Sequence, residues 1–265
     1  MNYLEKDNKE KIARDLLNLY NVTRKYSNIF PDTKPLYDAS EECRSMSSES
    51  RWKYAVNSLR IKVPEEGTIP NSFPQKHDSI ELYFSCSVQG KYFNPERVYD
   101  PLEFLEFNIE IEGLGYLDNS DAYDIYSSWH LDKHSQVTGG KDTGSKYIHP
   151  EYHFTFGGKK LKEQLLGTQS ISSGLVFIPS TPRLPHPPMD AVLGVDFILQ
   201  QFISSKYRDD LLFSPEYQDV IRRSQARIWK KYATAFASHW NPDLKSDMDG
   251  TIDCEKLYPN IIHLA

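Results

Sequence analysis

The sequence predicts an α+β fold that forms a single domain over residues 1–265. Three observations predict this class: an apolar period of two in the middle of the chain, helical periodicity towards both ends, and a proline-rich run between the two kinds of pattern. Runs of strands followed by runs of helices are typical of α+β proteins. The expected order is an N-terminal helix, an antiparallel β-meander of four to five strands, a proline-rich crossing and two C-terminal helices.

The first 75 residues are predicted to be helical or irregular. A helix is expected over residues 5–27, where apolar residues recur at helical spacing among charged ones. The apolar positions are Ile12, Leu16, Leu19, Tyr20 and Val22. Prolines interrupt residues 28–75 and favour turns there, with one short helix expected near residues 50–59.

Residues 76–180 are predicted to form the β-meander. Apolar and polar residues alternate in most of its segments, which indicates strands with one buried face. The predicted strands span residues 80–88, 107–112, 123–134, 149–156 and 174–178. A glycine-rich loop joins the third and fourth of these segments, so we expect residues 123–134 and 149–156 to be adjacent antiparallel strands.

The C-terminal part begins with residues 179–188, where five prolines favour an extended crossing. The apolar run over residues 189–204 predicts a buried helix. Ser214, which precedes a proline, predicts the N-terminus of a second helix. The two helices occupy residues 189–240, and residues 241–265 are expected to be an irregular tail.

Composition limits the classes of function. The formal net charge is −6, whereas nucleic-acid-binding domains are basic, so no nucleic acid is expected as a partner. No apolar run is long enough to cross a membrane and the N-terminus lacks a signal-peptide core, so we expect a cytoplasmic protein that contacts no membrane. Arg223 and Arg227 share one side of the second C-terminal helix, where a solvated face explains them.

The three cysteines are expected to be neither catalytic nor disulfide-bonded. Cys43, Cys86 and Cys254 lie too far apart for a CxxC motif, and their odd number argues against a disulfide framework. Cys86 shares the apolar parity of its predicted strand, so its thiol is expected to be buried and inert.

A group of histidines and carboxylates carries the strongest chemical signal. Each of the two strands that flank the glycine-rich loop presents a histidine, a carboxylate and a second histidine on one face. The six residues are His130, Asp132, His134, His149, Glu151 and His153. One register of the hairpin pairs residue 130 with 153 and residue 132 with 151. A register shifted by two residues keeps the same face and places carboxylates opposite histidines.

Three interpretations of this patch stay open. The six side chains could bind a divalent metal, since neutral imidazoles and carboxylates are the usual ligands of zinc, manganese or iron. His130, Asp132 and His153 could also perform acid–base catalysis near neutral pH. The third interpretation is a ladder of ion pairs and hydrogen bonds on the polar side of a sheet, or a face that binds a ligand or partner.

His186 is a further catalytic candidate, because prolines on both sides of it hold its backbone still. The alternative is a flap over the edge of the sheet in which His186 is simply exposed.

The order of the predicted elements resembles the ubiquitin-conjugating enzyme fold over roughly residues 5–240. That family places a His-Pro-Asn motif and a catalytic cysteine between its last strand and the next helix. Here no cysteine lies between Cys86 and Cys254, and His186 is followed by two prolines. The resemblance therefore implies the topology without the conjugating activity.

Two peptides, residues 149–154 and 182–190, also look similar to those of uncharacterised bacterial proteins found with mobile-element or defence genes. Two functions follow as hypotheses. The first is a non-catalytic binding or accessory component of a bacterial multi-protein system, with another protein as its partner. The second is a metal-dependent hydrolase that uses the histidine patch of the hairpin.

Overall fold

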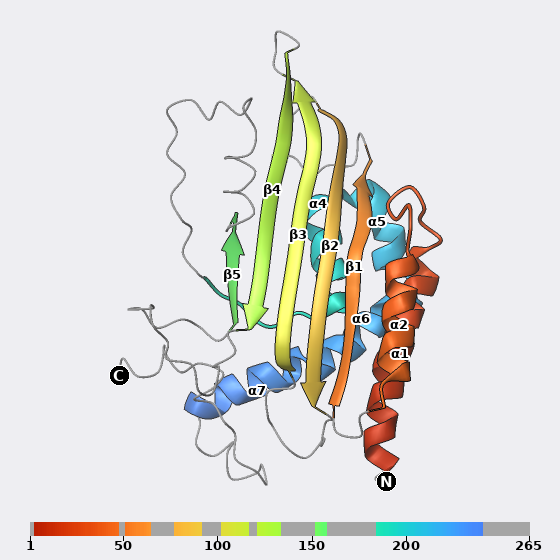
Figure 1. The fold of residues 1–265 in the computed structure, drawn as a ribbon, viewed down its shortest axis with the longest axis vertical. Coiled ribbons are helices and arrows are strands. Elements are labelled where there is room, and N and C mark those ends of the chain that lie inside the picture. Colours follow the sequence, from red (N-terminus) through yellow and green to blue (C-terminus); the bar gives the residue numbers. More distant parts are fainter. Residues whose placement is uncertain are drawn as a thin grey trace.

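The computed structural model shows a six-stranded antiparallel sheet with helices on one face and along one edge (Figure 1). The residues that the structure describes are 3–47, 51–64, 77–91, 102–116, 121–133, 152–157 and 184–240. The predicted strand at residues 174–178, the tail at 241–265 and Cys254 lie outside them. Among the described residues, no helix is both long enough and apolar enough to cross a bilayer.

The strands follow one another in space as they do along the chain. They are β1 (Arg51–Val63), β2 (His77–Lys91), β3 (Leu102–Tyr116), β4 (Ala122–Lys133), β5 (Tyr152–Phe156) and β6 (Leu184–Pro185). Each pairs antiparallel with the next, in the order β1-β2-β3-β4-β5-β6. The predicted α+β class and antiparallel meander are therefore confirmed.

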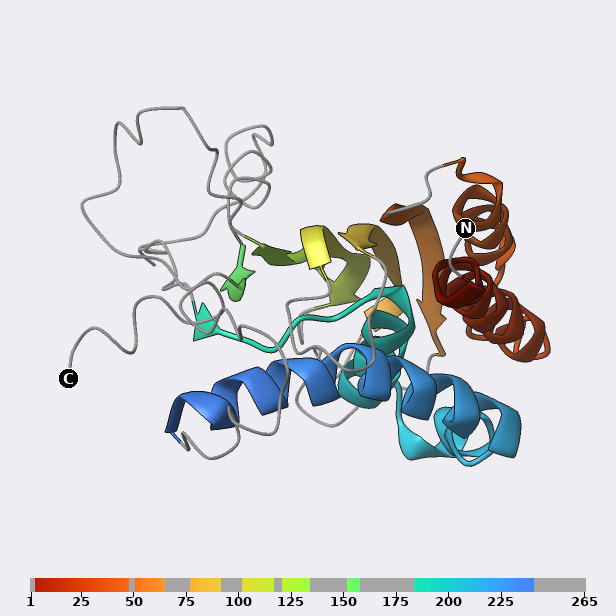
Figure 2. The same cartoon turned by 90° about the horizontal axis from the view of Figure 1, so that it is seen from below.

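The helices form two groups. They are α1 (Tyr3–Thr23), α2 (Lys34–Ser45), α4 (Ala191–Phe202), α5 (Ser205–Leu212), α6 (Pro215–Arg227) and α7 (Trp229–Trp240). Helices α4, α6 and α7 lie against one face of the sheet, whereas α1 and α2 lie beside β1 (Figure 2). The predicted N-terminal helix and C-terminal helices are present; the last predicted helix is divided at Ile228 into α6 and α7.

The helix predicted near residues 50–59 is wrong, because this segment belongs to β1. Buried and exposed residues alternate in this segment as they do in a strand, but the buried positions change from even to odd residue numbers halfway along it. Trp52, Tyr54 and Val56 are buried before a β-bulge, and the buried positions then continue from Leu59. Ser58 in the bulge has φ 51°, which moves the buried face from even to odd residues.

The outer edge of β1 is closed by the N-terminal part of the chain. The backbone N–H of Ala55 donates to Oε2 of Glu42 in α2 at 2.8 Å. Further along, the backbone N–H of Lys62 donates to the carbonyl of Ile29 at 2.7 Å. These bonds satisfy edge groups that would otherwise be free to pair with another strand.

Helix α4 approaches the sheet closely at a glycine. A Cβ on Gly194 would lie 2.5 Å from the ring of Phe107 and 2.6 Å from that of Phe84. These rings are fully buried and pack edge to face at 5.0 Å. Glycine is therefore required here by the helix–sheet distance, although it is a poor helix former.

A buried ion-pair network connects α1, α4 and α6. Asp15 accepts from Nε of Arg223 at 2.7 Å and from Nη1 of Arg227 at 2.8 Å. Asp190, the N-cap of α4, accepts from the Leu193 backbone N–H and from Oγ of Ser224 at 2.7 Å, and Arg227 lies 3.4 Å from it. The solvated face expected for the two arginines is thus wrong for Arg227, whose side chain is only 12% exposed.

Candidate functional site

The predicted hairpin is present, with β4 and β5 as adjacent antiparallel strands. Asp132 pairs with His153, and His130 pairs with Thr155. This is the register shifted by two residues, which places a carboxylate opposite a histidine. Three of the six patch residues, His134, His149 and Glu151, lie outside the described part of the chain.

Asp132 lies between the two described histidines of the patch. Nε2 of His153 is 2.7 Å from Oδ1 of Asp132, and Nε2 of His130 is 3.1 Å from Oδ2. His153 is buried, whereas the side chains of His130 and Asp132 are 36% and 31% exposed. The three side chains therefore form one cluster at the boundary between the protein interior and solvent.

Two residues that the sequence reasoning missed extend this cluster onto β3. Nδ1 of His130 lies 2.6 Å from Oδ1 of Asn108, and Nδ2 of Asn108 donates to Oε1 of Glu106 at 3.3 Å. Asn108 is one of the polar positions of the strand predicted at 107–112, and this was the sequence signal for it. Its place beside His130 follows from the pairing of β3 with β4. We call Glu106, Asn108, His130, Asp132 and His153 the hairpin network.

The electrostatics of the network keep Asp132 ionised. Burial alone would raise the pKa of this carboxyl group, but the contacts with His130 and His153 lower its pKa below the ordinary range. The carboxylate thus remains charged and can hold both rings in place.

Three of the four ring nitrogens in the network face oxygen atoms. A histidine binds a metal, or removes a proton, through a nitrogen with a free lone pair. Both nitrogens of His130 face oxygen atoms, and Nε2 of His153 faces Asp132. Over the described residues, no group of three His, Cys, Asp or Glu side chains is arranged to hold a metal ion. This geometry favours the ladder interpretation.

The metal interpretation stays a prediction. It would need at least one ring nitrogen of His130 to turn away from its oxygen partner, Asn108 or Asp132. It would also draw on His134, His149 and Glu151, which lie outside the described residues.

His186 lies on the other side of the sheet from the hairpin network. Its ring packs on Phe154 at 5.2 Å between centroids, and Phe154 in turn packs against Phe197 of α4. Phe154 and His153 are neighbours in β5 and therefore point to opposite faces. Burial lowers the pKa of His186, although its Nδ1 lies 2.6 Å from the Pro187 carbonyl. The structure does not bring His186 together with His130, Asp132 and His153.

The two cysteines within the described residues are buried, as expected for Cys86. Burial raises the pKa of the Cys43 thiol to about 12 and that of Cys86 well above its usual value. Neither thiol is activated for nucleophilic chemistry.

No family model matches the sequence, and comparison with curated proteins and with solved structures gives no match. The resemblances to the ubiquitin-conjugating fold and to mobile-element or defence proteins therefore stay predictions.

Proposed function

We propose that this chain is a non-catalytic binding or accessory component of a bacterial multi-protein system, of the kind encoded with defence genes, and that its partner is another protein. The observation that carries the proposal is a pair of exposed apolar side chains at the β5–β6 edge of the sheet. The second support is chemical: three of the candidate catalytic groups, His130, Asp132 and His153, are engaged with one another.

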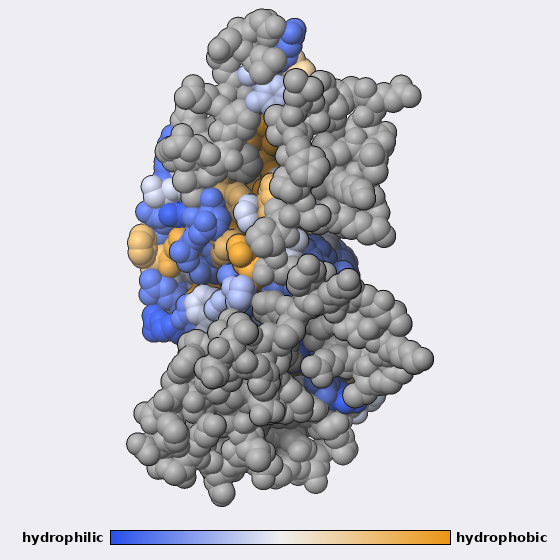
Figure 3. Space-filling model, turned by 90° about the vertical axis from the view of Figure 1, so that its left-hand side faces the viewer, coloured by the Kyte–Doolittle hydropathy of each residue, from blue (hydrophilic) through white to orange (hydrophobic). Residues whose placement is uncertain are grey.

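The apolar side chains at this edge are Leu184, which is 57% exposed, and Phe156, which is 37% exposed. The ring of Phe156 packs edge to face on Trp129 at 5.0 Å between centroids. Hydrophobic surface is visible beside hydrophilic surface on this side of the molecule (Figure 3). Large apolar side chains that are exposed next to one another are typical of sites where a partner docks.

The hairpin network lies on the opposite face of the same strands from these apolar side chains. Pro185 pairs with His153 and Leu184 pairs with Phe154, so the apolar and polar groups occupy the two faces of the same strands. The partner is therefore expected to place apolar side chains on Leu184 and Phe156, on the face away from the network.

A pair of matched substitutions tests the binding proposal. The tagged chain is isolated from the cells that produce it, and its associated proteins are identified and then purified for direct binding. Leu184→Asp should weaken binding of that partner at least tenfold, about 1.4 kcal/mol or more. Phe213→Asp changes an apolar residue that is 70% exposed away from this edge, and it should leave binding unchanged. Equal effects of the two substitutions would contradict the proposed surface.

The alternative function, a metal-dependent hydrolase, is separated by metal analysis of the purified protein. A hydrolase should contain about one divalent ion per chain and lose it in Asp132→Asn. The binding proposal expects no bound metal and an unchanged partner affinity in that variant. A stoichiometric metal together with metal-dependent hydrolysis would overturn the binding proposal.

A further inference from the structure

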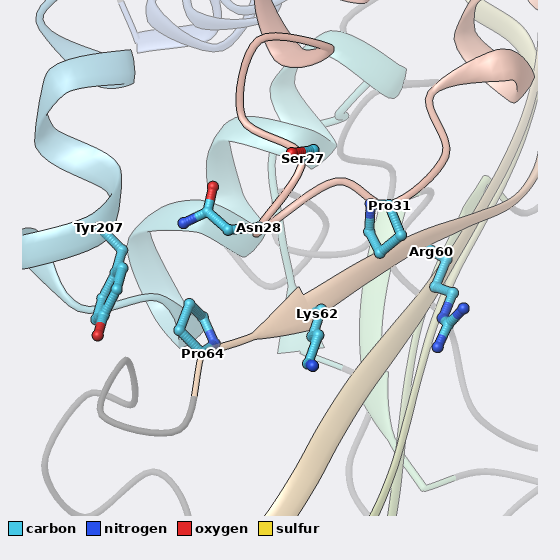
Figure 4. Close-up of a pocket in the computed structure, with 7 residues that line it drawn as sticks. All are labelled: Ser27, Asn28, Pro31, Arg60, Lys62, Pro64 and Tyr207. Atoms are coloured by element: carbon cyan, nitrogen blue, oxygen red, sulfur yellow. The ribbon is translucent and has the colours of Figure 1, made fainter.

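A hollow lies at the end of β1, on the opposite side of the molecule from the β5–β6 edge. Its volume is about 760 Å³, within the range of about 300–1,000 Å³ that is usual for small-molecule sites. Three segments line it: the connection between α1 and α2, the end of β1, and α5 (Figure 4). The lining residues are Ser27, Asn28, Pro31, Arg60, Lys62, Pro64 and Tyr207.

The β-bulge of β1 directs two cations to this hollow. Before the bulge the even-numbered residues of β1 are buried; after it Arg60 and Lys62 are exposed on the outer face. The backbone N–H of Lys62 is fixed by the Ile29 carbonyl, which also holds the α1–α2 connection in place. The side chains of Lys62, Arg60 and Tyr207 extend in the same direction from their elements (Figure 4).

The lining carries donors and no carboxylate. Lys62, Asn28, Ser27 and Tyr207 each offer an N–H or O–H group. Within the described part of the chain, the Lys62 ammonium forms no ion pair or hydrogen bond. Pro31, Pro64 and the ring of Tyr207 supply apolar walls between these groups.

We propose that this hollow binds a small phosphorylated molecule, with its phosphate on Lys62 and Arg60 and its organic part against the prolines and Tyr207. A phosphate group has several acceptor oxygens, so it can accept from an ammonium, a guanidinium and neutral donors at once. This site is independent of the partner surface at the β5–β6 edge.

Glu81 on β2 already binds Arg60, one of the two cations of the proposed phosphate site. Its Oε2 accepts from Nε of Arg60 at 2.7 Å and from the Tyr83 hydroxyl at 2.9 Å, and Glu81 is the cross-strand partner of Lys62. A bound phosphate must therefore compete with this carboxylate for Arg60. Removing the charge of Glu81 should strengthen phosphate binding, which a purely structural role for Arg60 and Lys62 does not predict.

Isothermal titration of the full chain with inorganic pyrophosphate and with adenosine monophosphate tests the proposal, with adenosine as the uncharged control. Lys62→Ala should weaken binding of both phosphates at least about tenfold, since a charge-assisted hydrogen bond is lost. Lys53→Ala, an exposed lysine on the same strand and outside the hollow, should change the affinity less than about twofold. Glu81→Gln should tighten binding several-fold.

Each outcome of this experiment decides the proposal. Tighter binding of adenosine monophosphate than of pyrophosphate would support a ligand with an organic part, and the reverse would restrict the site to the phosphate group. The proposal is overturned if neither phosphate binds up to millimolar concentration. It is also overturned if Lys53→Ala weakens binding as much as Lys62→Ala. In that case the phosphate is attracted by lysines of β1 in general and not by the hollow. Thermal unfolding of each variant confirms that it is folded.

Discussion

Asp132 is the residue on which the two described histidines of the hairpin converge. One carboxylate faces two imidazoles at 2.7 and 3.1 Å and remains partly accessible to solvent. Such a residue contributes to stability through its charge, and its contribution must therefore depend on pH.

We expect Asp132→Asn to lower the free energy of unfolding at pH 7 by about 1 kcal/mol. The folded pKa of Asp132 lies below the unfolded value of about 3.9, so the charge stabilises the fold fully above that value. The contribution is lost as the pH falls through the folded pKa. Urea unfolding at pH 7 and at pH 3 should therefore show a smaller difference between variant and wild type at pH 3. The control is Asp124→Asn, exposed on the same strand, which should change the free energy of unfolding at pH 7 by less than about 0.5 kcal/mol.

Gly194 gives a second prediction at this scale. Gly194→Ala should destabilise the protein by about 2 kcal/mol, because the added methyl group overlaps the buried rings of Phe84 and Phe107. The gain in helix propensity, about 1 kcal/mol, is too small to offset this overlap. Gln201→Ala on the exposed side of α4 should stay within about 0.5 kcal/mol in the same urea titration. A stabilised Gly194→Ala protein would show that α4 can move away from the sheet.

At the scale of elements, the sequence correctly predicted the strands in which the alternation of apolar and polar residues is uninterrupted. The alternation in 80–88, 107–112 and 123–134 identified β2, β3 and β4, whose parities run unbroken through those residues. β1 was missed because its bulge at Ser58 divides the pattern into two short halves of opposite parity. The helix α2 was missed because Pro35, near its N-terminus, reads equally well as a turn.

The hairpin network could likewise be predicted only as far as the alternation of residues along each strand allows. The face shared by His130, Asp132 and His153 follows from parity alone, and the carboxylate–histidine register was one of two that parity allowed. Asn108 and Glu106 could not be assigned, because only the pairing of β3 with β4 places them beside His130. Whether His186 reaches the patch could not be predicted, because the sequence does not reveal which face of the sheet the crossing covers.

The two N-caps of the C-terminal helices should differ in their energies. Ser214→Ala removes a cap of α6 and should cost about 1 kcal/mol. Asp190→Ala removes the cap of α4 and also leaves Ser224 and Arg227 without their buried carboxylate, so it should cost about 3 kcal/mol or more. Chemical denaturation compares the two variants directly. Similar losses would mean that the buried network adds nothing to the cap.

At the scale of the whole molecule, one arginine joins three helices. Arg227 contacts Asp15 of α1 and Asp190 at the start of α4 from its own position at the end of α6. These three helices are thereby held together by charge as well as by the apolar core.

We expect Arg227→Leu to cost about 3–5 kcal/mol, since two buried carboxylates lose their shared cation. Arg222→Leu, a neighbouring arginine with a side chain that is 65% exposed, should change stability by less than about 0.5 kcal/mol. Thermal and urea unfolding of both variants measure the contrast. The loss in Arg227→Leu should be partly recovered by adding Asp190→Asn, which removes the buried charge that has lost its arginine, whereas Asp15 still pairs with Arg223.

The bond between Asp15 and Arg227 also has a consequence for biosynthesis. Its partners are 212 residues apart in the chain. On the ribosome, at about 5–20 residues per second, Asp15 emerges roughly ten seconds or more before the arginine that neutralises it. Helix α1 can form during that interval but has no complete binding site, so the N-terminal helices must wait for the C-terminal ones. The nascent chain should therefore acquire its native protection late, in one step, after α6 leaves the exit tunnel.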